Sequence, residues 1–160
     1  MQYSGTFTAG LNTGQPVLAQ SDPIADAREF LRKASHLPFA ASHPFAWSAR
    51  FAQLIADARG SVKQHIIRAA RTDSPMMQIE RDEPRLKDAI ERQRQEHADL
   101  ARQIEDLYAE VSVANDIDIW RMIDLGEKAI LLEMALARHH NRLVRLVYET
   151  TNRELVGEAG

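Results

Sequence analysis

Apolar residues recur with helical spacing along most of the chain, most regularly between residues 84 and 111. In that segment, steps of four and three residues alternate, which is typical of a helix that packs at a shallow angle on its neighbours. The positions of this face are Leu86, Ile90, Gln93, His97, Leu100, Ile104, Leu107 and Val111. Charged residues fall on the opposite face, where pairs such as Arg92 with Glu96 are expected to remain in solvent.

Three further helices are predicted from the same spacing and from the residues that flank it. Asp22 can cap the free amides of a first helix, and Pro23 suits its first position. Residues 76–79 are predicted to form a turn that closes one end of the core. The four expected helices span about 22–36, 45–71, 84–111 and, starting near 116 or 118, as far as about 150.

The last helix carries two adjacent apolar stripes, which predict a wide buried face. One stripe contains Met122, Leu125, Ala129, Leu132, Leu136, His139, Leu143 and Leu146. The neighbouring stripe contains Ile119, Ile123, Gly126, Ile130, Glu133, Ala137, His140, Val144 and Val147. One short and three long helices with short connections predict an all-α, antiparallel up-down four-helix bundle, formed by residues 22–157 as one domain. Residues 1–21 lack helical periodicity and are expected to be a flexible or surface-docked arm.

Composition and charge narrow the function classes. The 160 residues are 44% hydrophobic, which is enough for one core, and they include no cysteine, so disulfides and thiolate ligands are excluded. The net charge of −3, with both signs interleaved, gives no basic face, and nucleic acid is therefore not an expected partner. No stretch of about 18 apolar residues suggests a membrane span, and we expect a cytoplasmic protein.

Three of the predicted helices each carry a histidine inside the apolar stripe: His65, His97 and His139. A lone histidine on such a face is more often a packed core residue than a ligand. Three on different helices favour a shared site, because imidazole is the commonest metal ligand and a bundle core brings facing helices together. Counting residues from the helix ends places the level of His97 only within about 10 Å of the other two.

Two segments of the chain resemble the hemerythrin-like family. The stretch from His65 to Leu107 contains a histidine near the end of one helix, then Glu83-Pro84-Arg85-Leu86 and Glu96-His97. The run Arg138-His139-His140-Asn141-Arg142-Leu143, followed by Leu146-Val147-Tyr148-Glu149 and Asn152, is similar to the last helix and tail of divergent bacterial members. The resemblance covers roughly residues 23–157. It implies a hemerythrin-like bundle in which His65, His97 and His139 correspond to metal ligands, with His140 as a substitute for His139.

The carboxylates that the family pattern requires are missing. In that pattern, histidines from all four helices and two bridging carboxylates hold two irons. Ala69 stands four residues after His65, Ala101 stands four after His97, and Arg145 stands five after His140. Glu133, two turns before His140, is the remaining candidate for an additional ligand. Because two adjacent cations in a low-dielectric core need anionic bridges, a di-iron centre is not expected.

The sequence therefore predicts a hemerythrin-like bundle with a degenerate metal site. We expect it to be non-catalytic, or to bind at most one metal ion, iron or zinc, through the three histidines. The alternative is a protein–protein interaction or self-assembly module without metal, which would use the arm or the last helix to form a homo-oligomer or to bind another protein. No phosphate-binding loop, nucleophile elbow or His-Glu-x-x-His motif supports an enzyme.

Overall fold

The computed structural model describes residues 22–39, 42–113 and 117–157, and every regular element in these ranges is helical. The elements are α1 (Pro23–Ser35), α2 (Pro44–Ala69), α3 (Pro75–Asp82), the 3-10 helix η1 (Pro84–Leu86), α4 (Lys87–Ser112) and α5 (Ile119–Gly157). The predicted all-α class is confirmed. The arm predicted for residues 1–21 lies outside the described residues.

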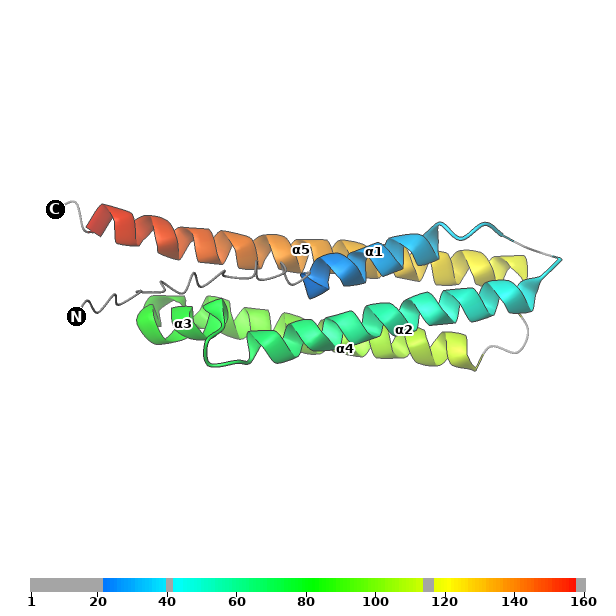
Figure 1. Ribbon diagram of the computed structural model, residues 1–160, viewed down its shortest axis with the longest axis horizontal. Coiled ribbons are helices and arrows are strands. Elements are labelled where there is room, and N and C mark those ends of the chain that lie inside the picture. Colours follow the sequence, from blue (N-terminus) through cyan, green and yellow to red (C-terminus); the bar gives the residue numbers. More distant parts are fainter. Residues whose placement is uncertain (1–21, 40–41, 114–116, 158–160) are drawn as a thin grey trace, which may run out of the picture.

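Helices α1, α2, α4 and α5 pack side by side in a ring. Both α1 and α4 contact α2 and α5, so that each of the four helices has two neighbours among the other three. Figure 1 shows that neighbours in this ring run in opposite directions along one long axis. Helix α5 has 39 residues and is therefore about 58 Å long, and it continues past the end of α2. There α3 packs against α4 and α5.

The helix starts follow from local capping chemistry. The carboxylate of Asp22 accepts a hydrogen bond from the backbone N–H of Ile24 at 3.1 Å, as its position before Pro23 predicts. Ser74 caps α3 in the same way, because its hydroxyl accepts a hydrogen bond from the N–H of Met77 at 3.2 Å. These caps set where α1 and α3 begin.

The hydrophobic core is divided along the long axis. The larger cluster lies between α1, α2, α4 and α5 and includes Phe51, Leu100 and Leu136. A smaller cluster lies toward α3 and contains Ala69, Met76, Ile79, Ile90 and Leu146. Along α4, every predicted face position from Ile90 to Val111 is buried, as its spacing indicated.

Two predictions about particular segments were wrong. Residues 76–79 belong to an eight-residue α-helix, α3, where a turn was expected, although Met76 and Ile79 do close one end of the core. The second stripe of α5 is not buried throughout: Ile119, Ile130 and Val144 are exposed. The ring of helices buries most of the first stripe of α5, whereas the second stripe is partly covered and exposed at these three positions.

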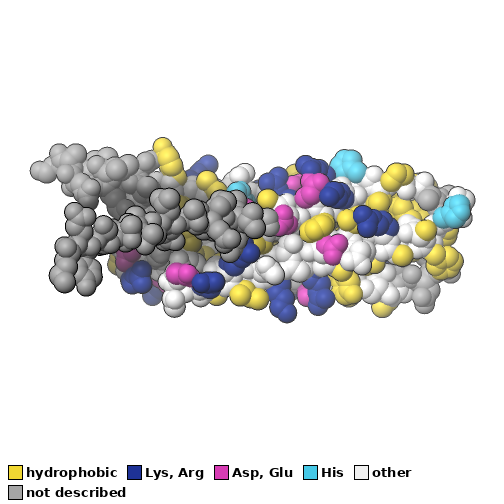
Figure 2. All heavy atoms as spheres, in the orientation of Figure 1, with side chains coloured by type: hydrophobic (Ala, Val, Ile, Leu, Met, Phe, Trp, Pro, Cys, Tyr) yellow, Lys and Arg dark blue, Asp and Glu magenta, His cyan; other side chains and the backbone are white. Residues whose placement is uncertain are grey.

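The surface carries charges of both signs. On the face drawn in Figure 2, Lys and Arg side chains lie among Asp and Glu side chains. Ion pairs between described residues include those of Lys128 with Glu110 and Asp124. None of the helices, as far as the structure describes them, is long and apolar enough to cross a membrane.

Candidate metal centre

The three histidines of the apolar stripes lie at one level of the ring, each on a different helix. His65 is four residues before the end of α2, whereas His97 is ten residues after the start of α4. Helix α4 therefore begins about 9 Å beyond the end of α2, measured along the axis. The intervening segment accommodates this offset by forming α3 and η1, and so it sets the register that brings the two histidines together.

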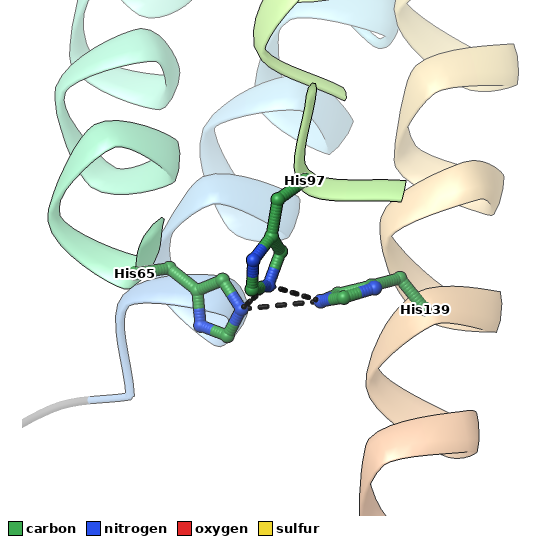
Figure 3. A group of neighbouring side chains, drawn as sticks. All are labelled: His65, His97 and His139. Atoms are coloured by element: carbon green, nitrogen blue, oxygen red, sulfur yellow. Dashed lines mark hydrogen bonds between the residues drawn. The ribbon is translucent and has the colours of Figure 1, made fainter. Parts of the chain in front are cut away.

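The imidazoles point at one another through the same ring nitrogen. The three Nε2 atoms form a nearly equilateral triangle, because each of the three Nε2–Nε2 distances is 3.1 Å. The rings meet edge to edge at steep angles, with interplanar angles of 81°, 85° and 62° (Figure 3). His65, His97 and His139 are 8%, 6% and 1% exposed, so the triangle is inside the protein.

This triangle has the dimensions of a three-histidine metal site. With metal–nitrogen bonds of about 2.05 Å, a triangle of this size places an ion about 1 Å above its plane, with N–metal–N angles of about 98°. That angle lies between those of one face of an octahedron and of a tetrahedron. Ions that prefer either geometry therefore fit with small side-chain adjustments.

A carboxylate and a guanidinium extend the site outward from His139. Nδ1 of His139 lies 2.9 Å from Oε2 of Glu96, and Arg142 donates a hydrogen bond to Oε1 of the same carboxylate. The helical spacing predicts Glu96 on the solvated face beside Arg92. The structure instead directs it across the gap between α4 and α5, with its side chain 24% exposed. Glu96 is thus a site residue that the helical pattern did not identify.

Burial keeps the three imidazoles neutral at physiological pH. Desolvation is the main cause for each: it lowers the pKa of His65 to about 4 and that of His97 to about 3, and it also lowers the pKa of His139. The neighbouring imidazole of His139 lowers the pKa values of His65 and His97 further. Glu96 acts in the opposite direction on His139, because its carboxylate raises the pKa of that imidazole. Neutral imidazole is the form that binds metal, so protons compete weakly at pH 7.

The two additional residues named as possible ligands have other partners. His140 faces Asp22, with Nδ1 at 3.6 Å from Oδ2, at the start of α1. Glu133 forms an ion pair with Arg28 of α1 at 2.8 Å. Within the described part of the chain, the cluster of candidate ligand atoms consists of His65, His97 and His139.

Two cavities reach the cluster from different sides. One, of about 510 Å³, is lined by His65 and by Ala69, Arg68 and His140 among others. The other, of about 340 Å³, is lined by His97 together with Met76, Met77 and Arg94 on the side of α3. Small molecules therefore have space next to two of the three imidazoles.

Comparisons with protein-family models, with curated proteins and with solved structures gave no match to this chain. The hemerythrin-like resemblance of the sequence thus stays a prediction.

Proposed function

We propose that this protein binds one transition-metal ion through Nε2 of His65, His97 and His139. The observation that carries the proposal is the triangle of three buried Nε2 atoms, each 3.1 Å from the other two. Three imidazoles from three helices form a preorganised set of neutral nitrogen donors, which suits Zn²⁺ or Fe²⁺ and gives no preference for Mg²⁺ or Ca²⁺.

Hydrogen bonding among the imidazoles alone accounts poorly for this triangle. A neutral imidazole has one N–H and one lone pair. If His139 donates its only N–H to Glu96, at most two N–H groups remain for three Nε2–Nε2 contacts. At least one contact then brings together two lone pairs or two N–H groups at 3.1 Å. A cation bound by all three lone pairs removes that conflict.

Three protein ligands leave room for an exchangeable fourth one. Structural zinc sites are closed by four protein ligands, whereas sites that act on a small molecule keep one position for water or substrate. The cavities beside His65 and His97 give water and small ligands access to such a position. We therefore favour an ion that carries water or a small anion.

The di-iron centre of the full hemerythrin-like pattern does not fit these residues. Ala69 and Ala101 stand where further ligands were sought, and Glu133 is paired with Arg28. Two ions would place several positive charges among neutral imidazoles, without a carboxylate bridge between them. A single ion avoids this repulsion.

Metal analysis of protein purified without an affinity tag tests the proposal. After treatment with a chelator and reconstitution with zinc or, anaerobically, with ferrous iron, we expect about one equivalent in the wild-type protein. His140→Ala is the matched control and should retain it, because His140 faces Asp22. The combined variant His65→Ala, His97→Ala, His139→Ala should retain none while circular dichroism shows its helices intact. A reconstituted wild-type protein without bound metal would contradict the proposal.

A second candidate function, self-association through α5, is favoured by a different observation. Ile130, Leu131 and Met134 lie within five consecutive residues of this helix and are 45%, 64% and 46% exposed. Neighbouring exposed apolar side chains are typical of interfaces. Light scattering would detect a dimer that the double substitution Leu131→Glu, Met134→Glu converts to a monomer. A monomer for the wild-type protein at all concentrations would exclude this function.

A further inference from the structure

We infer that Glu96 is a positioning residue for the metal site. It holds His139 in the tautomer that leaves Nε2 unprotonated, and Arg142 holds Glu96 in place. The predicted effect on metal affinity rests on the proposed function, whereas the effect on the tautomer can be measured without any metal.

The contacts of Glu96 determine which nitrogen of His139 carries the proton. Arg142 donates a hydrogen bond to Oε1, and an ionised carboxylate can only accept. Nδ1 of His139, 2.9 Å from Oε2, must therefore be the donor. The single proton of the neutral ring is then on Nδ1, and the lone pair of Nε2 points into the triangle. The ring is thus fixed in tautomer and orientation before an ion arrives.

The arrangement couples two helices at the site. Glu96 and His97 are consecutive on α4, so one short segment supplies a ligand and also the carboxylate that orients the ligand of α5. Arg142 lies three residues after His139 on α5 and binds the same carboxylate from the outside. The exposed fraction of the side chain increases along this series, from 2% for His139 to 24% for Glu96 and 58% for Arg142.

The other two imidazoles differ in this respect. Between described residues, the hydrogen-bond contacts of the His65 and His97 imidazoles are made through Nε2. Among the described residues, His139 is the ligand whose Nδ1 contacts a carboxylate. We therefore predict that substitution of Glu96 affects one ligand, His139. The ring of His139 is already oriented for metal binding before an ion arrives.

Competition with a chromophoric zinc chelator tests the effect on affinity. Glu96→Leu should weaken zinc binding by about 10- to 100-fold, the range typical of outer partners of ligating histidines. Glu96→Gln keeps a hydrogen-bond acceptor without the charge, and its zinc affinity should lie between those of Glu96→Leu and the wild-type protein. Asp99→Asn is the matched control: it removes a carboxylate three residues away that pairs with Arg102, and affinity should be unchanged. Equal affinities for Glu96→Leu and Asp99→Asn would overturn the inference.

Nitrogen-15 NMR of histidine-labelled, chelator-treated protein tests the tautomer directly. His139 should show the Nδ1–H form in the wild-type protein and should shift toward the Nε2–H form in Glu96→Leu, while Asp99→Asn leaves its spectrum unchanged. An unchanged His139 tautomer in Glu96→Leu would overturn the inference whatever the affinities are. If the wild-type protein bound no zinc but Glu96→Leu still shifted the His139 tautomer, the proposed function would be refuted and the inference about Glu96 would stand.

Discussion

Acidification of the metal-free protein should lower its free energy of unfolding between pH 6.5 and pH 5. The folded protein holds the pKa of His65 at about 4 and that of His97 at about 3, whereas in the unfolded chain both should titrate near 6.5. Below pH 6.5, the unfolded chain therefore binds more protons than the folded one. The stability is complete above pH 6.5 and is lost as the pH falls toward the folded pKa values.

The size of this loss follows from the same pKa values. Each histidine that is neutral when folded and protonated when unfolded contributes at most 1.36 kcal/mol per pH unit. Because the unfolded histidine is half protonated at pH 6.5, this amounts to about 1.6 kcal/mol between pH 6.5 and pH 5. The lowered pKa of His139 acts in the same direction. His97→Leu should remove about 1.6 kcal/mol of the loss, because leucine does not titrate.

Urea unfolding followed by circular dichroism, in the presence of a chelator, measures these differences at pH 7.5, 6.5, 5.75 and 5. Leu100→Ala serves as the matched control one turn further along α4. It removes a buried side chain without a titrating group, and it should lower the stability by the same amount at each pH. If the wild-type protein and His97→Leu lost equal stability between pH 6.5 and pH 5, the assignment of His97 as a buried neutral imidazole would be refuted.

Three further predictions concern metal and packing. His97→Leu should leave the metal-free protein equally or more stable, because it removes a buried polar group, but the zinc-reconstituted variant should melt below the reconstituted wild type. Zinc at 1,000 times its dissociation constant should stabilise the wild-type protein by about 4 kcal/mol, and a melting temperature unaffected by zinc would contradict this. Leu100→Ala and Leu136→Ala should each cost about 2–5 kcal/mol in chemical denaturation, since both side chains lie in the larger core cluster. A cost below 1 kcal/mol at both positions would contradict the assigned core.

The helices and the buried face of α4 could be predicted because they depend on local spacing. A period of 3.6 residues places Ile90, Leu100 and Ile104 on one face whatever the neighbouring helices do, and these residues are buried. Whether the second stripe of α5 is buried depends instead on how many helices cover it. Ile130 and Val144 are as apolar as the residues of the first stripe, yet the ring leaves them exposed.

The axial level of His97 could not be fixed from sequence because it depends on the segment between α2 and α4. Those residues could connect the helices at several offsets, and α3 selects one by burying Met76 and Ile79 against the ends of its neighbours. The role of Glu96 was missed for a related reason. Its position on α4 is at the flank of the buried face, and only the place of α5 decides whether its carboxylate reaches His139 or solvent.

The three histidines occupy positions where leucine would serve the core better in the absence of an ion. Their neighbours one turn away include Leu100 and Leu136, which are buried at 4% and 0% exposure, so the surroundings are apolar on that side. Burying a neutral imidazole costs free energy unless both nitrogens find partners. His139 obtains one partner from Glu96, and among the described residues the three Nε2 atoms contact one another. An added proton shared among the three Nε2 atoms would be unfavourable at pH 7, because burial lowers all three pKa values. A bound metal ion satisfies the three lone pairs together, and this makes metal binding the best-supported reason for placing three imidazoles at one point of an apolar core.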